Sequence, residues 1–332
     1  MTAPSRLLKN PGLLLIATIA AGGATSTEAT SESATSTTIA SPVTAVADEG
    51  KATGFVNKAK KLFALDAQTA LISKPVWELG VGAAFFSGHD YPASDDPNDT
   101  ALALPFFVYR SERVRVQGGG VGAVAIERPR FKLDVSLGGS LNAESSGNAT
   151  REGLPDLDFL FELGPRLNIL LSRRLHANGA TSTWRWLNSI QGVVSTDFSV
   201  VNGRGYTFKT ELEWKHANAF GSAVDLQLQL DAQWATRNLH DYFYSVASQF
   251  ATPTRAAFRA RSGYLGATTS IGLGYEITPA LRLFSGVQFE NFRGAANSDS
   301  PLFETENTIN YAVAIVWTLR SSKRRITVFD DD

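Results

Sequence analysis

The chain has 332 residues, of which 19% are charged, and its formal net charge at pH 7 is −1. This near balance excludes the basic surface of a nucleic-acid-binding protein and a strongly acidic tail. The chain contains no cysteine, which excludes disulfides, thiolate metal sites and a cysteine nucleophile.

Residues 1–24 have the order of a secretory signal peptide. Arg6 and Lys9 form a short positive segment, the apolar run 13–21 follows, and small residues come next at 22–24. The apolar run is too short to cross a bilayer, because a membrane-spanning helix needs about 20 apolar residues. We therefore predict a signal peptide that is removed on export.

Residues 25–72 are predicted to form a disordered linker. Ser, Thr, Ala and Glu dominate 25–49, and this composition cannot build an apolar core. Residues 51–70 mix apolar side chains with lysines and have the pattern of a frayed amphipathic turn or two.

Residues 73–320 alternate in polarity over segments of about ten residues that turn residues separate, which is the pattern of barrel strands. In 224–234 the even positions carry Val, Leu, Ala and Trp, and the odd positions carry Asp and Gln. A period of two separates these sets completely, whereas a helix would mix them. Clear strands are also predicted at 131–142, 206–214, 281–290 and 308–319, and weaker ones at 77–86, 101–110, 114–126, 158–171, 182–194 and 263–277.

Three features favour a membrane barrel over a soluble sheet. A signal peptide precedes the strands, and the strands are longer than the usual ~5–6 residues of soluble sheets. Aromatic side chains lie near the ends of the predicted strands, as interface girdles do: Trp77, Tyr109, Trp184, Trp186, Tyr206, Trp214, Trp234, Tyr275 and Trp317. We predict an all-β fold, a transmembrane antiparallel up-and-down β-barrel of about 12 strands (about 10–12) in the outer membrane of a Gram-negative bacterium. Its surface would contact the lipid bilayer and lipopolysaccharide.

The order of the loops leaves the topology open. Counting back from the C-terminus places 293–307 outside the cell and the turn at 278–280 inside. Eleven strands place 143–157 outside as well, but single-chain bacterial barrels normally have an even number of strands. A twelfth strand at 241–246 restores an even number and moves 143–157 to the inside.

Two stretches carry a family resemblance. Residues 77–110 contain the glycine-rich strand WELGVGAAFF, a Tyr-x-x-Ser-Asp-Asp segment and the strand LALPFFVYR. Residues 241–319 contain DYFYSV, then Gly-Leu-Gly-Tyr, a DSP loop and a closing strand. Over roughly 76–319 the chain resembles the MipA/OmpV family, the MltA-interacting proteins of Gram-negative outer membranes. The resemblance implies a barrel that scaffolds murein (peptidoglycan) synthesis and brings a lytic transglycosylase together with a bifunctional murein synthase.

No group of residues in the sequence forms a recognisable catalytic or metal site. The pairs His89–Asp90 and His240–Asp241 are adjacent in sequence, but neighbours on a strand point to opposite faces. No Gly-x-Ser-x-Gly motif supports a hydrolase. The acidic segment 90–99 lacks the ligand spacing of a calcium loop. We expect no catalytic residue, no metal, no cofactor and no enzymatic activity.

The polar faces of the predicted strands place charged side chains in the lumen. These charges either line a narrow channel for small polar solutes or neutralise one another in a filled lumen. The candidates are Asp134, Glu162, Arg166, Arg185, Lys209, Glu211, Glu213, Asp225, Asp231, Arg282 and Glu290.

Basic residues follow the last predicted strand, at and within the C-terminal tail 321–332. They either contact an anionic glycan or an acidic partner in the periplasm, or belong to a solvated tail. The candidates for partner contact are Arg320, Lys323, Arg324 and Arg325. The sequence thus supports an outer-membrane scaffold of the murein synthesis machinery or, alternatively, a narrow channel for small polar solutes, with no nucleic acid as a partner.

Overall fold

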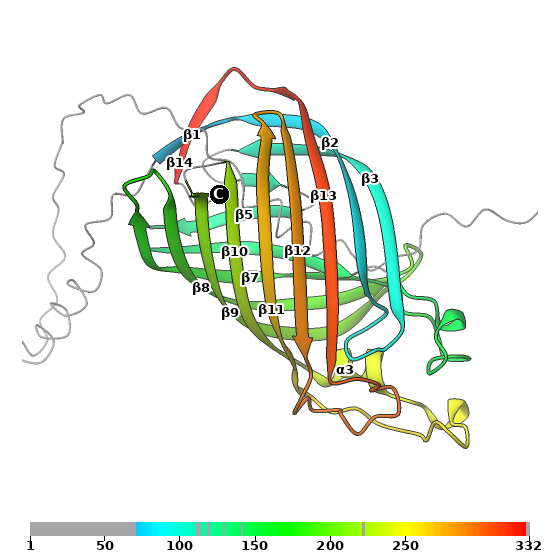
Figure 1. The fold of residues 1–332 in the computed structure, drawn as a ribbon. Coiled ribbons are helices and arrows are strands. Elements are labelled where there is room, and N and C mark those ends of the chain that lie inside the picture. The colour runs from blue at the N-terminus through cyan, green and yellow to red at the C-terminus, as the bar shows by residue number, and fades with distance from the viewer. Residues whose placement is uncertain are drawn as a thin grey trace, which may run out of the picture.

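The computed structural model describes residues 71–110, 114–117, 120–128, 130–140, 142–220 and 223–329 (Figure 1). The predicted signal peptide at 1–24 and residues 25–70 of the predicted linker lie outside the described residues. No helix in the described part of the chain has the length and apolar character needed to cross a membrane.

Twelve strands of the described chain form a closed antiparallel barrel, which confirms the predicted fold class. Each strand pairs with its neighbours along the chain, and β13 pairs with β2 to close the ring. The strands are β2 (Trp77–His89), β3 (Pro97–Arg110), β4 (Val114–Gln117), β5 (Gly120–Glu127), β6 (Phe131–Ser140), β7 (Phe159–Leu175), β8 (Thr181–Thr196), β9 (Val201–Ala219), β10 (Val224–Ala235), β11 (Gly263–Thr278), β12 (Leu281–Asn291) and β13 (Asn307–Ser321).

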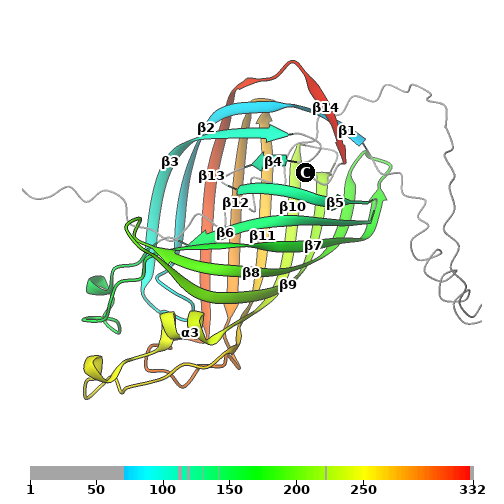
Figure 2. The same ribbon diagram turned by 180° about the vertical axis from the view of Figure 1, so that it is seen from behind.

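The region predicted as a single strand at 114–126 is two strands, β4 and β5 (Figure 2). Gln117 pairs with Gly120, so the two strands form a hairpin. The two glycines that separate these partners in the sequence lie outside the described residues. This division, which the alternation did not reveal, makes the number of strands even.

The segment 241–246 is not a strand, and that prediction is wrong. Helix α3 spans Arg237–Tyr244, and Leu239, His240, Phe243 and Tyr244 are its buried residues. Positions three and four apart lie on one face of a helix, so the aromatic residues that suggested a strand form a helical apolar face. The twelfth strand comes instead from the division of 114–126 into β4 and β5. An even number of strands is therefore compatible with an outer position for 143–157.

Two further strands lie outside the barrel. β1 (Leu71–Pro75) pairs with β14 (Arg325–Phe329) in an antiparallel ribbon. Figures 1 and 2 show this ribbon at the end of the barrel where β2 begins and β13 ends. Residues 325–329 of the predicted tail therefore form a strand that joins the two ends of the described chain.

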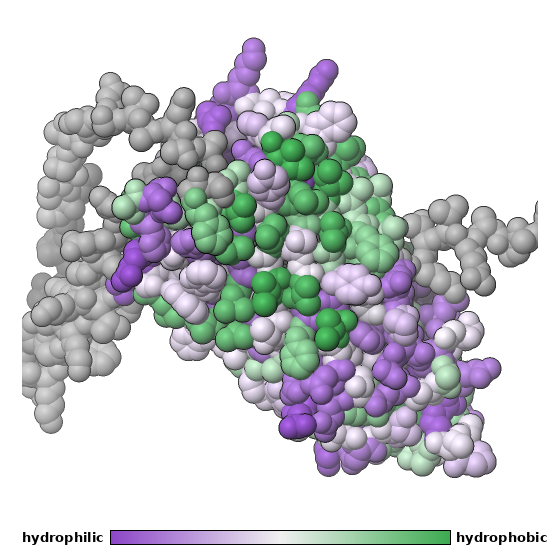
Figure 3. Space-filling view, in the orientation of Figure 1, coloured by the Kyte–Doolittle hydropathy of each residue, from purple (hydrophilic) through white to green (hydrophobic). Residues whose placement is uncertain are grey.

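The side chains of each strand alternate between an apolar outer face and a polar inner face. On β8, Trp184 and Trp186 are 36% and 44% exposed, whereas Arg185 between them is 4% exposed. Figure 3 shows an apolar band across the barrel wall with hydrophilic side chains toward both ends. Such a band is the lipid-facing surface of a membrane barrel. Its most exposed members include Leu104, Leu163, Ile190, Ile271, Val287, Ile309 and Trp317.

The long connections gather at the end opposite the ribbon (Figure 1). They are the loop 90–96, the loop 142–158 with η1 (Ser145–Gly147), the loop 236–262 with α3 and η2 (Ser248–Phe250), and the loop 292–306. Outer-membrane barrels have short periplasmic turns and longer extracellular loops. The loop end is therefore the outer end, and the ribbon lies at the periplasmic end.

Candidate functional site

Charged side chains on the inner face pair across neighbouring strands. Arg185 on β8 lies opposite Glu213 on β9, and their side chains form an ion pair with an N–O distance of 3.1 Å. Glu213 also lies 3.4 Å from the ammonium of Lys215 and accepts a hydrogen bond of 3.0 Å from Gln227. Directly opposed charges of this kind stabilise the pairing of two strands.

Asp134 on β6 forms a second cross-strand pair with Arg166 on β7. The Nε and Nη2 atoms of Arg166 each donate a hydrogen bond of 3.1 Å to one carboxylate oxygen of Asp134. The Lys132 ammonium lies 3.7 Å from the same carboxylate. The bidentate geometry gives this pair both strength and a fixed orientation.

The other predicted lumen residues also lie on the barrel strands, and most have polar partners. Lys209 lies 3.5 Å from Asp231 and 3.6 Å from Glu211. Arg282 pairs with Glu276 at 3.0 Å, Glu290 accepts a hydrogen bond of 2.7 Å from Thr308, and Asp225 accepts one of 3.0 Å from the backbone of Asn218. Glu162 is half-buried on β7. The inner face therefore carries opposite charges that largely compensate one another.

At the outer end, Glu304 joins three loops through hydrogen bonds. Its carboxylate accepts hydrogen bonds of 3.1 Å from the hydroxyls of Tyr91 and Ser94 and one of 3.2 Å from the backbone of Asp95. Its other oxygen accepts a hydrogen bond from the Thr150 hydroxyl. Burial and the Glu304 carboxylate hold the pKa of Tyr91 well above its usual value, so Tyr91 remains a neutral donor.

Two buried arginines hold the loops through backbone carbonyls. Arg151 donates hydrogen bonds of 3.1 Å to the carbonyls of Phe243 and Pro155. Arg255 donates to the carbonyls of Thr150, Glu152 and Phe250 at 2.8, 2.9 and 3.0 Å. Each guanidinium therefore links segments that no regular strand pairing connects.

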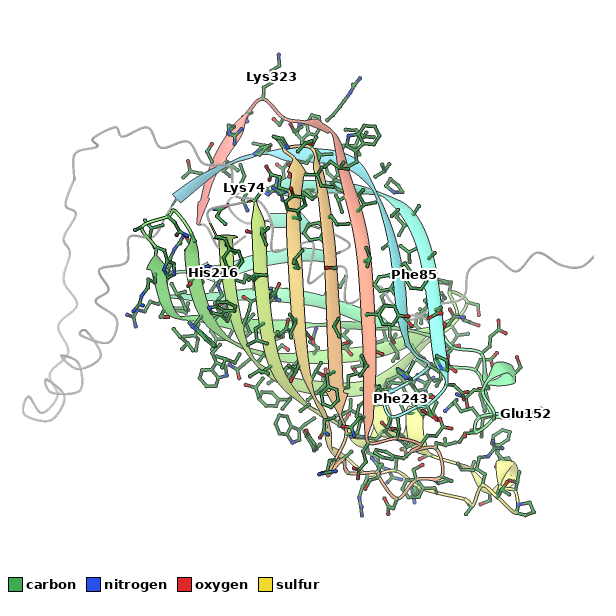
Figure 4. The ribbon with its side chains drawn as sticks, in the orientation of Figure 1. Lys74, Phe85, Glu152, His216, Phe243 and Lys323 are labelled. Carbon is green, nitrogen blue, oxygen red and sulfur yellow. The ribbon has the colours of Figure 1, made fainter. Side chains whose placement is uncertain are left out.

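An apolar core lies beneath these bonds. It joins α3 and the loops to the outer ends of β7, β8, β10 and β11, and Figure 4 shows Phe243 and Glu152 at this end of the barrel. The core contains Tyr91, Ala143, Leu157, Leu160, Val193, Ala235, Leu239, Phe243, Tyr244, Ala260 and Leu265. The outer loops are therefore a packed cap, which the sequence did not predict.

The acidic segment 90–99, which follows β2, is connected to this cap by hydrogen bonds. Asp90 accepts hydrogen bonds of 2.8 Å from Asn98 and 3.1 Å from Asn148. His89 on β2 bonds to Asn310 at 2.9 Å. Within the described residues, no three His, Asp or Glu side chains are grouped so that they could hold a metal ion.

At the periplasmic end, a cavity of about 430 Å³ lies between the barrel strands and the β1–β14 ribbon. Among the predicted partner-contact residues, Arg320 and Arg325 line this cavity, whereas Lys323 and Arg324 are exposed in the turn before β14. Glu78, Arg110 and Glu276 also line the cavity, and although all three lie within the predicted strands, alternation alone did not mark them as candidates. The lining comprises Ser73, Lys74, Pro75, Glu78, Arg110, Glu276, Pro279, Ala280, Arg282, Thr318, Leu319, Arg320, Ser321 and Arg325.

A closed antiparallel barrel with an apolar outer band, a charged inner face and long loops at one end defines a β-barrel protein of bacterial outer membranes. The family model of the MltA-interacting protein MipA matches residues 81–319, and the chain therefore belongs to this family. The family resemblance read from the sequence is confirmed. The protein is located in the outer membrane of Gram-negative bacteria.

Solved structures of other outer-membrane barrels are similar at low identity. A bacterial polysaccharide outer membrane secretin is 7% identical, with a TM-score of 0.32 and coverage of 73% of this chain and 99% of that chain. An outer membrane channel from Pseudomonas putida F1 is 9% identical, with a TM-score of 0.32, and the match covers 77% of this chain and 100% of the channel chain. The outer membrane phospholipase A from Escherichia coli is 12% identical, with a TM-score of 0.28, and the match covers 74% of this chain and 98% of the phospholipase chain.

Similarities of this size carry no argument about function. A comparison with curated protein sequences gives no significant match.

Proposed function

We propose that this chain is an outer-membrane interaction protein that binds a lytic transglycosylase in the periplasm and links it to a bifunctional murein synthase. The observation that carries the proposal is the match of residues 81–319 to the family of the MltA-interacting protein MipA. The contact would lie at the periplasmic end, because murein enzymes act in that compartment. Two features at that end could contact the enzyme. They are the exposed turn with Lys323 and Arg324, and the β1–β14 ribbon.

The pairing of charges on the inner face supports an interaction role over transport. Arg185 with Glu213, and Arg166 with Asp134, place opposite charges against each other, and three of these four side chains are only 5–8% exposed, whereas Arg166 is 39% exposed. The packed cap lies at the end through which a solute from outside would enter (Figure 1).

The proposal assigns no catalysis to the chain. On the outer face near the periplasmic end, the Ser182 hydroxyl lies 2.8 Å from His176 Nε2 and 2.8 Å from His216 Nδ1. Within the described residues neither histidine has a carboxylate partner. A serine nucleophile of the triad type needs a histidine that an acidic group orients. The two hydrogen bonds of Ser182, to His176 and to His216, are therefore interpreted as polar contacts at the membrane interface.

The experiment is recovery of the lytic transglycosylase with the tagged chain from detergent-solubilised envelopes at native expression. The charge reversals Lys323→Glu and Arg324→Glu change the periplasmic turn, and we expect them to reduce the recovered enzyme. Arg259→Glu and Arg293→Glu are the matched control, because both residues are exposed at the outer end. Failure of the unmodified chain to recover the enzyme would contradict the proposal.

The alternative is a narrow channel for small polar solutes, which the polar inner face and the periplasmic cavity favour. Single-channel conductance of the folded chain in a planar bilayer separates the two functions. We expect no discrete openings. Steady openings whose ion selectivity shifts with Glu211→Gln and Glu213→Gln would instead establish the channel.

A further inference from the structure

The outer surface of the barrel carries a polar cluster at the periplasmic edge of β7, β8 and β9. Arg174 on β7 lies directly opposite Ser182 on β8, and Ser182 lies directly opposite His216 on β9. Directly opposed residues of antiparallel strands share one face, with Cβ atoms about 4.5–5.5 Å apart. His176, in the turn after β7, joins them through its hydrogen bond of 2.8 Å to Ser182. These four residues form the interface cluster.

The interface cluster lies at the level of the lipid headgroups. Trp184 and Trp214 are the next outward-facing residues toward the middle of β8 and β9, and their ring centroids lie 6.3 Å apart. Aromatic side chains of membrane barrels gather at the headgroup level. Figure 4 shows His216 toward the end of the barrel opposite Phe243 of the outer cap. The cluster therefore faces the periplasmic leaflet of the membrane.

The two imidazoles leave a hydrogen-bond donor available to a ligand. The Ser182 hydroxyl has one proton, so one imidazole donates to its oxygen and the other accepts its proton, each at 2.8 Å. The second nitrogens, Nδ1 of His176 and Nε2 of His216, have no partner in the described residues, and neither is buried. With both rings neutral, either arrangement leaves one N–H on these two nitrogens.

Arg174 supplies positive charge beside this donor. It is exposed and has no hydrogen bond or ion pair within the part of the chain that the structure describes. Trp214 stacks on His216, with ring centroids 5.6 Å apart and planes at 8°, which orients the imidazole and leaves its edge free. A guanidinium can donate two parallel hydrogen bonds to phosphate oxygens. The cluster therefore matches a phosphate group in charge and in donors.

We propose that the interface cluster binds the phosphate of one phospholipid of the periplasmic leaflet. The acyl chains of this lipid would lie along Trp184 and Trp186, both of which are exposed. A lipid is favoured over a dissolved anion because the cluster continues directly into the lipid-facing surface. The site goes beyond the proposed function, since it lies on the outer wall and requires no protein partner.

The test is native mass spectrometry of the full chain, folded in non-ionic detergent micelles and titrated with dioleoylphosphatidylglycerol. The first lipid should bind at least about tenfold more tightly than dioleoylglycerol, which has the same acyl chains and no phosphate. Arg174→Gln should weaken the binding of phosphatidylglycerol at least about fivefold. The matched control is Arg320→Gln, because Arg320 is also an exposed arginine near the periplasmic end and lies opposite the outward-facing Leu79. This control should bind within about twofold of the unmodified chain.

His216→Phe separates hydrogen bonding from packing, because phenylalanine can still stack on Trp214. It should weaken the binding of phosphatidylglycerol about threefold. Heat-modifiable migration on a gel shows that each variant is folded. Equal binding of the two lipids, or equal weakening by Arg174→Gln and Arg320→Gln, would overturn the proposal. Displacement of the bound lipid by inorganic phosphate would assign the cluster to a dissolved anion and would also overturn it.

Discussion

Arg185 and Glu213 stand opposite each other on β8 and β9 and form an ion pair of 3.1 Å with only 5% and 8% of their side chains exposed. Arg185→Leu removes one partner and leaves the buried carboxylate of Glu213 with Lys215. Removing one member of a buried pair typically costs about 3–5 kcal/mol, so we expect a loss toward the lower part of that range. Urea unfolding in micelles, followed by tryptophan fluorescence, measures the loss.

The control for this prediction is an exposed pair in the outer loops. Arg293 and Glu306 lie 3.2 Å apart, with 76% and 52% of their side chains exposed. Arg293→Leu should change the free energy of unfolding by less than about 1 kcal/mol, because solvent screens exposed pairs. Equal losses for Arg185→Leu and Arg293→Leu would show that burial does not determine the contribution of Arg185.

Glu304 connects the loops of the outer cap, and Glu304→Gln should loosen them. The amide cannot accept all the hydrogen bonds that the carboxylate receives from Tyr91, Ser94 and Thr150. Each bond to a charged group contributes about 1.5–3 kcal/mol, so local opening should become much more frequent. The rate of cleavage of the outer loops by added protease measures this opening. Glu306→Gln on the same loop is the control and should leave the rate unchanged.

Alternation predicted the barrel strands well because it depends on residues that are close in the sequence. The predicted strands 224–234 and 281–290 agree with β10 (Val224–Ala235) and β12 (Leu281–Asn291). The pairing of Arg185 with Glu213 was not predictable in the same way. Alternation places both side chains on one face, but the register of β8 against β9 decides which charges meet.

Most of the features that the sequence did not predict have no periodic pattern among residues close together in the chain. β14 has five residues and pairs with β1 from the other end of the described chain. Glu304 and Arg151 lie in loops, where no period marks a residue that joins distant segments. Helix α3 did carry a helical spacing in Leu239 and Phe243, but its aromatic content favoured a strand.

His240 makes the stability of the cap depend on pH. It is fully buried on α3, with Nε2 bonded to the carbonyl of Gly263 at 3.2 Å and Nδ1 without a partner in the described residues. Burial lowers the pKa of His240, and the Gly263 carbonyl and Asp241 offset this only in part. The unfolded chain has the usual pKa near 6.5 and therefore takes up the proton first as the pH falls.

The contribution of His240 to stability should thus be complete above about pH 6.5 and should decrease as the pH falls toward the lowered pKa of the folded state. His240→Phe keeps an aromatic ring beside Tyr244 and removes the titrating group. Hydrogen exchange of residues 236–262 between about pH 5 and 7.5 measures the effect. Parallel pH profiles for the variant and the unmodified chain would contradict the assignment.

Gly164 on β7 lies against the backbone of β8 so closely that a side chain has no space. A Cβ atom there would overlap the carbonyl oxygen of Ile190 and lie 2.7 Å from the Cα of Gln191. Because these are backbone atoms, Gly164→Ala must push β7 and β8 apart, and we expect a loss of at least about 1–3 kcal/mol and less folded protein in outer-membrane fractions. Gly203→Ala on β9 is the control, since no atom lies within 4 Å of its Cβ position. It should change stability by no more than about 0.5 kcal/mol, and equal amounts of heat-modifiable protein from both variants would show that β7 and β8 tolerate the added carbon.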